Sequence, residues 1–224
     1  MVAVASRSAV NFSLLLYYIT DRLQFAGDEN DQRQALLHKI AEASGCGVDF
    51  IQLREKDLCT RDLESVAQAA VAVIRKSSQK TKLLINSRSD VALACGADGV
   101  HLRADDLSPR EVRKIWPQPG PIVPVSCHSV ADTGRAASEG ADFVVFAPVF
   151  EKKGDVKVQP KGLDALREAC QRSIRVLALG GVTLENAHEC IEVGAAGVAG
   201  IRLFQGNDVA EVVRALRGWS EHLC

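Results

Sequence analysis

One short phrase recurs four times along the chain and constrains its fold more than any other feature. Each copy places a glycine and small residues directly before a short apolar run, and the four copies occupy residues 46–53, 95–102, 139–146 and 193–200. The copies recur about every 50 residues, the length of two strand-and-helix units. A glycine in this context typically ends a helix. The repeat therefore predicts a chain assembled from many similar units.

Four further apolar runs lie between the copies of the phrase, at residues 15–20, 82–86, 122–126 and 175–180. All eight runs are continuous rather than alternating, as expected for parallel strands buried on both faces. Helical patterns fill the intervals between them. Eight such alternations predict a single-domain α/β fold, a (β/α)8 TIM barrel over residues 14–224, preceded by a loose tail at 1–13. A doubly wound open sheet is the alternative, but it does not account for eight units.

The composition excludes several classes of partner. Lysine and arginine number 27 against 28 aspartates and glutamates, so we expect neither nucleic acid nor a membrane surface as partner. No apolar run approaches the roughly 20 residues that span a bilayer, and no signal-peptide cleavage pattern follows the first run. The seven cysteines show no metal-binding spacing. We therefore predict reduced thiols in a cytoplasmic protein.

The glycines that end the seventh and eighth runs predict a phosphate site. In a barrel of this kind the active site lies at the carboxyl ends of the strands. Backbone N–H groups at Gly180, Gly181, Gly200 and Ile201 could approach an anion closely, with Arg202 beside them. The alternative is that these glycines only permit tight turns.

Three alternating polar residues end the second run. Gln52, Arg54 and Lys56 share one face of an extended chain, and at the mouth of a barrel that face is the lumen. Two cations there predict an anionic group on the substrate. The alternative is a strand end whose cations pair with Glu55 or Asp57.

The end of the fifth run carries a candidate acid or base. His128 follows Ser126 at the predicted mouth, where a histidine can titrate near neutral pH and move a proton. We expect His101, on the preceding run, to be structural. The charged segment 151–161 is either a loop that closes over the mouth or a solvated connector.

In chain order, these stretches resemble the thiamine-phosphate synthase/TenI family of barrels. The likeness extends from about residue 15 to residue 204 and implies both the barrel fold and a role in thiamine biosynthesis. The pieces that carry it are YITD at 18–21, QLREK at 52–56, LINSRSDVA at 84–92, GADGVHL at 96–102, VSCHS at 125–129, GADF at 140–143 continuing to PVF at 148–150, ALGGV at 178–182 and GAAGVA at 194–199.

The resemblance implies one of two activities on small phosphorylated substrates. The synthase joins hydroxymethylpyrimidine diphosphate to a thiazole phosphate and releases pyrophosphate, with Mg²⁺ held by two aspartates. TenI-like members isomerise a thiazole carboxylate phosphate by proton transfer, with a histidine as acid/base and without a metal. The Gln52, Arg54 and Lys56 cluster fits a diphosphate, as in the synthase.

This chain departs from the synthase pattern around the implied metal site. Ser87 stands where the synthase has one metal-binding carboxylate, while Asp106 keeps the second and would bind Mg²⁺ if the metal is used. Arg103 adds a cation beside it, and residues 151–154 replace a Thr-x-Thr-Lys loop. Mg²⁺ prefers anionic oxygen ligands. These changes favour the TenI-like reaction.

We therefore predict a thiazole tautomerase that needs no cofactor. His128 would move the proton, Asn86 and Ser126 would orient the ring, and Arg54 and Lys56 would hold the carboxylate. The first alternative is a Mg²⁺-dependent thiamine-phosphate synthase, and the second is a non-catalytic protein that binds a thiazole or thiamine phosphate. Barrels of this size often pair, so a homodimer is one expected state.

Overall fold

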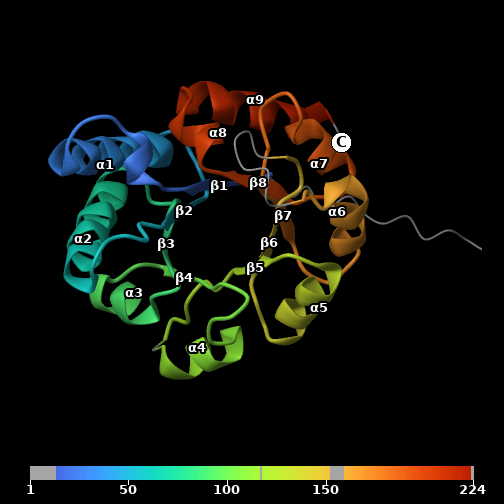
Figure 1. The fold of residues 1–224 in the computed structure, drawn as a ribbon, viewed down its shortest axis with the longest axis horizontal. Coiled ribbons are helices and arrows are strands. Elements are labelled where there is room, and N and C mark those ends of the chain that lie inside the picture. Colours follow the sequence, from blue (N-terminus) through green and yellow to red (C-terminus); the bar gives the residue numbers. More distant parts are fainter. Residues whose placement is uncertain (1–13, 117, 152–158, 223–224) are drawn as a thin grey trace, which may run out of the picture.

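Eight parallel strands form a ring with the helices packed around its outside (Figure 1). The computed structural model describes residues 14–116, 118–151 and 159–222, so the predicted tail at 1–13 lies outside the described residues. The strands are β1 (Leu15–Ile19), β2 (Phe50–Leu53), β3 (Lys82–Asn86), β4 (Gly99–His101), β5 (Val125–Cys127), β6 (Val144–Phe146), β7 (Val176–Ala178) and β8 (Gly197–Gly200). Their hydrogen-bonded order is β4-β3-β2-β1-β8-β7-β6-β5.

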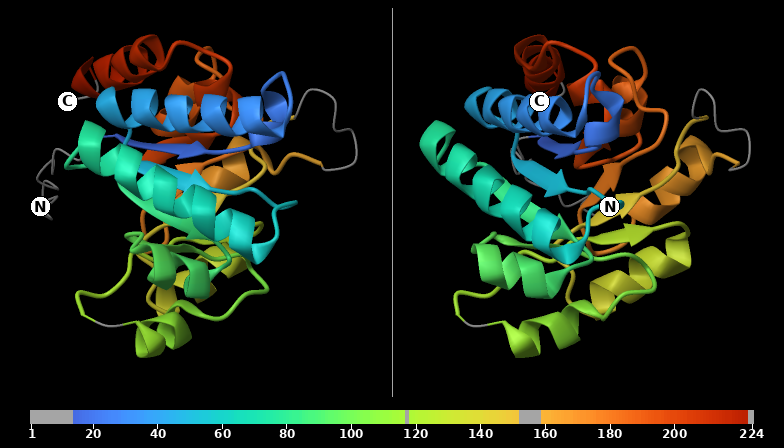
Figure 2. Two further views of the ribbon diagram at one scale, coloured as in Figure 1. Left: turned by 90° about the vertical axis from the view of Figure 1, so that its left-hand side faces the viewer. Right: turned by 60° about the vertical axis from the view of Figure 1, so that its left-hand side comes forward.

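The helices follow the strands in alternation and wrap the ring, with α1 and α2 lying along the outside of β1 and β2 (Figure 2). No helix among the described residues is long and apolar enough to cross a membrane. In chain order the helices are the short 3-10 turn η1 (Arg22–Gln24), α1 (Glu29–Gly45), α2 (Thr60–Ser77), α3 (Ser89–Cys95), α4 (Pro109–Ile115), α5 (Val130–Ser138), α6 (Gly162–Cys170), α7 (Ala187–Glu192), α8 (Arg202–Gln205) and α9 (Val209–His222).

The two ends of the sheet meet between β4 and β5 and close the ring. Gly99 pairs with Ile122 and Leu102 pairs with Val125 through isolated bridges. The Val100 N–H donates to the Ile122 carbonyl at 3.1 Å, and the Ser126 N–H donates to the Leu102 carbonyl at 2.9 Å. The predicted barrel is therefore confirmed, and the open-sheet alternative is wrong.

The repeated phrase builds the amino end of the even-numbered strands. Gly47, Gly96, Gly140 and Gly194 follow α1, α3, α5 and α7 with φ between 68° and 105°, the left-handed conformation that ends helices. Each glycine turns the chain into the next strand, so the predicted helix stops are confirmed.

The aspartate of the phrase bonds to the neighbouring odd-numbered strand. Asp49 accepts the Leu16 N–H at 2.7 Å, Asp98 accepts the Leu83 N–H at 2.9 Å, and Asp142 accepts the Val123 N–H at 2.6 Å. Each carboxylate also pairs with a cation: the three partners are Arg217, Lys82 and Arg113. The fourth copy has Ala196 at this position and lacks such a carboxylate.

Large side chains fill the interior of the ring. Tyr17, Phe50 and Phe143 pack with ring centroids 4.8–5.9 Å apart, and Leu84 and Leu177 add to this inner cluster. A second and larger apolar layer lies between the strands and the helices. The interior of the barrel is therefore a packed core rather than a pore.

The closing seam predicts a sharp difference between two glycine substitutions. A methyl group at Gly99 would lie 1.9 Å from the Ile122 carbonyl oxygen, whereas one at Gly134 in α5 would have nothing within 4 Å. We expect Gly99→Ala to lower the free energy of unfolding by about 2 kcal/mol or more because the strands must move apart. Gly134→Ala should raise it by about 0.5 kcal/mol. Urea denaturation of both variants measures this difference, and equal effects would contradict it.

Candidate active site

A cavity of about 1060 Å³ lies at the carboxyl ends of the strands. Eleven of the twelve predicted site residues line it, from β2, β3, β5, β8 and the segments that follow β2, β5, β7 and β8. These are Gln52, Arg54, Lys56, Asn86, Ser126, His128, Gly180, Gly181, Gly200, Ile201 and Arg202. The twelfth, Asp106, lines a smaller cavity of about 180 Å³ beside it. The fold thus brings eleven of these positions together and leaves Asp106 outside this cavity.

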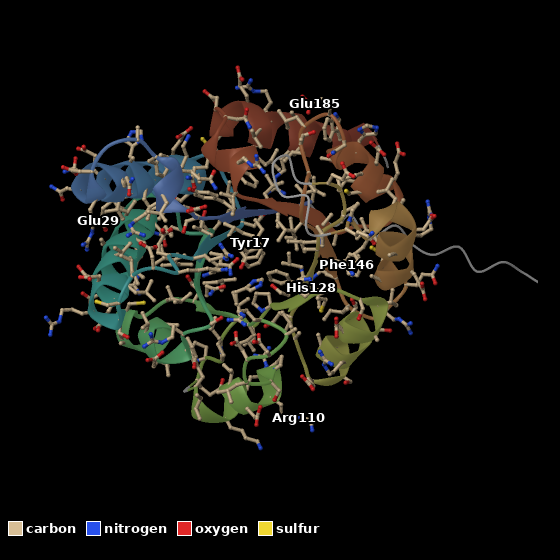
Figure 3. All side chains as sticks on the ribbon, in the orientation of Figure 1. Tyr17, Glu29, Arg110, His128, Phe146 and Glu185 are labelled. Carbon is tan, nitrogen blue, oxygen red and sulfur yellow. The ribbon has the colours of Figure 1, made fainter. Side chains whose placement is uncertain are left out.

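The cavity has further polar lining residues that sequence reasoning missed. They come from η1, the loop after β7 and the segment after α8, and are Gln24, Thr183, Glu185, Asn186 and Asn207. These positions do not directly follow a strand, so the strand-end rule gave no signal for them. Figure 3 shows Glu185 at the rim beside α7, whereas Tyr17 and His128 lie toward the middle of the ring.

Gln52 and Asn86 form a polar pair on adjacent strands. The Gln52 Nε2 donates to Asn86 Oδ1 at 2.8 Å, and the Asn86 Nδ2 donates to Ser87 Oγ at 3.3 Å. Ser87 has φ 61°, a left-handed conformation that is uncommon for a residue other than glycine. The turn at Ser87 directs the chain away from the sheet and leaves the two amides side by side in the cavity wall.

Arg54 presents a half-buried cation to the cavity. Burial, together with the charge of Arg103, lowers the pKa of its guanidinium below the ordinary value, while Asp21 and Glu55 partly oppose this shift. An arginine nevertheless stays protonated in proteins. No described carboxylate lies within 4 Å of it, so the charge is available to an anionic ligand.

The carboxylates that flank Arg54 in sequence bind a different arginine. Glu55 accepts from the Arg22 backbone N–H at 2.9 Å and from its guanidinium at 3.4 Å. Asp57 takes two hydrogen bonds from Arg22, at 2.7 and 2.6 Å. Thr20 donates to Glu55 at 2.5 Å and accepts the Arg54 N–H at 3.0 Å. Glu55 and Asp57 therefore bond to Arg22, and neither forms an ion pair with Arg54 within 4 Å.

Both glycines after β7 pack against the segment after β6. Gly180 and Gly181 have φ of 95° and 66°. A methyl group would lie 2.6 Å from the Pro148 side chain at Gly180, and 2.4 Å from the Glu151 carbonyl oxygen at Gly181. The glycines are therefore required by the turn and the close approach, and the same turn exposes backbone to the cavity.

His128 lies in the cavity wall with one ring nitrogen fixed. Its Nδ1 is 2.9 Å from the Ala147 carbonyl oxygen. A carbonyl only accepts, so we assign the hydrogen of the neutral ring to Nδ1. The Nε2 lone pair of the neutral ring is then able to accept a proton.

His101 is buried in a chain of three hydrogen-bonding groups. Its Nδ1 is 2.8 Å from the Tyr17 hydroxyl, and its Nε2 is 2.8 Å from Ser126 Oγ. Burial, with a smaller effect of Arg54, lowers the pKa of His101 to about 3. Its expected structural role therefore involves a polar network as well as packing. The neighbouring Cys127 is buried in the apolar layer outside the ring, and burial raises the pKa of its thiol to about 12.

The carboxylates nearest to the implied magnesium site have other partners. Asp90 forms an ion pair with the adjacent Arg88 at 2.6 Å, and Asp105 forms one with Arg103 at 2.5 Å. Asp106 accepts the Arg103 backbone N–H at 2.7 Å. Within the described residues no three histidine, cysteine or acidic side chains form a group able to hold a metal ion. These residues do not fit a tight Mg²⁺ site, which needs several free anionic oxygens.

The buried position of Glu55 predicts a large loss of stability when its charge is removed. Its side chain is 1 % exposed against 45 % for Asp57, although both pair with Arg22. We expect Glu55→Gln to lower the free energy of unfolding by about 3 kcal/mol, because the buried carboxylate accepts from Thr20, the Arg22 N–H and the Arg22 guanidinium, and an amide cannot accept from all of them. The matched Asp57→Asn change should cost about 1 kcal/mol or less. Chemical denaturation measures both, and a larger loss for Asp57→Asn would contradict this account.

Comparisons with known proteins extend over most of the chain. The family model described as thiamine monophosphate synthase matches residues 16–204. The thiamine-phosphate synthase of Methanoculleus marisnigri is 42% identical over 206 residues, covering 90% of this chain and 93% of that protein. That of Caldanaerobacter subterraneus is 35% identical over 205 residues, covering 90% and 92%.

A solved structure shows the same relationship. Thiamine phosphate pyrophosphorylase from Pyrococcus furiosus superposes with a TM-score of 0.78 at 29% identity, covering 95% of this chain and 98% of that one. The sequence resemblance, the matched family model and this fold agree with one another. The chain belongs to the thiamine-phosphate synthase/TenI family.

Proposed function

We propose that this protein is a thiamine-phosphate synthase, which joins hydroxymethylpyrimidine diphosphate to a thiazole phosphate. This proposal reverses the preference drawn from the sequence. The observation that carries it is that relatives 42% and 35% identical to this chain bear the synthase name. The cavity of about 1060 Å³, with two sets of candidate anion-binding groups in its wall, supports it.

The two sets suit the two phosphorylated halves of the reaction. Arg54 and Lys56 lie after β2, and a diphosphate is the more highly charged group that two cations would hold. The loops at Gly180–Gly181 and Gly200–Ile201 lie after β7 and β8, where barrels commonly bind a single phosphate through backbone N–H groups. The pyrimidine half would therefore lie toward β2 and the thiazole half toward β8.

In this arrangement the protein aids departure of the pyrophosphate. The bond between the pyrimidine methylene carbon and the diphosphate oxygen breaks, and the thiazole nitrogen forms a new bond to that carbon. Arg54 and Lys56 would stabilise the negative charge that develops on the leaving group. The Gln52 and Asn86 amides, joined at 2.8 Å, would orient the pyrimidine ring beside them. Because the nearby carboxylates do not fit a tight magnesium site, we assign this step to the side chains alone.

One observation favours the tautomerase as a second candidate. The Nδ1 of His128 bonds to the Ala147 carbonyl, which leaves Nε2 as the candidate base on a residue that lines the cavity. A thiazole carboxylate phosphate also carries two anionic groups, which the same two sets would hold. The reaction would then be a proton transfer by His128, without a metal.

Product identification separates the two activities. We expect thiamine phosphate and pyrophosphate to form from the two phosphorylated halves, in assays with and without Mg²⁺. Arg54→Met should lower kcat/KM for the pyrimidine diphosphate by about a hundredfold, the effect of losing a hydrogen bond to a charged group. The surface variant Arg167→Met should leave it unchanged. No product from the wild-type protein at saturating Mg²⁺ would refute the proposal, and tight binding of thiamine phosphate without turnover would indicate a binding protein.

The tautomerase candidate makes its own prediction. If the wild-type protein isomerises the thiazole carboxylate phosphate, His128→Ala should slow that reaction by at least about a hundredfold, since a general base contributes this much. The exposed His38 on α1 gives the control, and His38→Ala should have the wild-type rate. Nuclear magnetic resonance of the substrate measures the rate directly. An unchanged rate in His128→Ala would remove His128 from the mechanism.

A further inference from the structure

Three polar groups from three strands connect the packed interior of the barrel to the cavity. Tyr17 on β1, His101 on β4 and Ser126 on β5 are joined by two hydrogen bonds of 2.8 Å, through Nδ1 and Nε2 of the histidine. Tyr17 and His101 are buried, whereas Ser126 is partly exposed in the cavity wall. The donor–acceptor direction of these two bonds determines whether Ser126 presents a hydrogen-bond donor or an acceptor to a ligand.

The buried tyrosine fixes the first bond. Tyr17 is completely buried, and burial raises the pKa of its hydroxyl, so the phenol keeps its hydrogen. Among the described residues, His101 Nδ1 is the hydrogen-bond partner of this hydroxyl. If Nδ1 carried a hydrogen, the phenol hydrogen would have no acceptor in the interior, which is strongly unfavourable. Tyr17 therefore donates, and Nδ1 accepts.

The second bond follows from the first. Burial and the nearby Arg54 disfavour a positive charge on His101, so the ring is neutral and carries one hydrogen. Since Nδ1 accepts, that hydrogen is on Nε2 and is donated to Ser126 Oγ. The hydroxyl hydrogen of Ser126 is then directed away from the histidine and is available to the cavity.

We propose that Tyr17 and His101 are positioning residues that hold the Ser126 hydroxyl as a hydrogen-bond donor toward the substrate. The partner would be an acceptor atom of the bound substrate, a ring nitrogen or a phosphoryl oxygen; this part rests on the proposed function. The direction of this histidine–serine hydrogen bond is opposite to that found at a serine nucleophile, where the histidine accepts the hydroxyl hydrogen. Ser126 therefore recognises an acceptor rather than attacking the substrate.

The tautomer of His101 can be observed without any substrate. Long-range ¹H–¹⁵N spectra of the histidine-labelled, ligand-free protein distinguish a ring nitrogen with hydrogen from one without. We expect His101 to show a bare Nδ1 and a protonated Nε2 at neutral pH, with its signals identified by their loss in His101→Gln. Hydrogen on Nδ1, or on both nitrogens, would overturn the proposal.

Removal of the tyrosine hydroxyl tests the consequence for the reaction. In Tyr17→Phe we expect a mixture of tautomers and a fall of about tenfold in kcat/KM, the effect of one hydrogen bond. Tyr18→Phe is the matched control, because Tyr18 is equally buried but donates to Gln205 at 2.9 Å. It should lose similar thermal stability while keeping the wild-type kcat/KM and the His101 spectrum.

A double variant separates positioning from packing. If Tyr17 acts through Ser126, Tyr17→Phe should cause no further loss of kcat/KM in a Ser126→Ala background. Additive losses would show that Tyr17 acts independently and would overturn the proposal. If the wild-type protein forms no thiamine phosphate, the proposed function fails, while the spectrum still decides the tautomer. Titration with thiamine phosphate then replaces kinetics, and equal affinity in wild type and Tyr17→Phe would overturn the role in recognition.

Discussion

Hydrogen bonds from strand N–H groups to carboxylates hold the amino end of the barrel, and the rest of the structure depends on them. Asp49, Asp98 and Asp142 each accept the N–H at or just before an odd-numbered strand. A one-residue slip of a strand would move every side chain to the opposite face. By fixing the register at one end, these bonds determine which side chains meet at the other. Asn86 and His101, for example, are direct partners across β3 and β4.

The fold and much of the cavity wall could be predicted because both follow from regular positions. Apolar runs mark parallel strands, and the residues directly after them gather at one end of a barrel. That rule alone selected Gln52, Arg54 and Ser126, which the structure brings into one wall. Asp106 came from the family resemblance instead, and it lies in a turn beside the cavity, where its carboxylate accepts a backbone N–H.

The remaining features depend on contacts between residues far apart in sequence. Arg22 belongs to no recognisable sequence motif. Its pairing with Glu55 and Asp57 depends on the position of η1 beside the end of β2, which only the folded structure shows. In the sequence, Tyr17 is an ordinary member of an apolar strand. Its hydrogen-bond partner, His101, lies 84 residues further along the chain. Side chains of this kind become recognisable only when burial and partners are known, because their chemistry depends on which groups surround them.

Ser87 shows that a single side chain at the end of β3 could change without a change in the backbone. Its backbone is in the left-handed region, with φ 61°, which aspartate and asparagine adopt more readily than most residues. An acidic residue would therefore be accommodated here without remodelling the end of β3. Divergence of function within this barrel can then proceed by exchange of single side chains at the strand ends on an unchanged backbone.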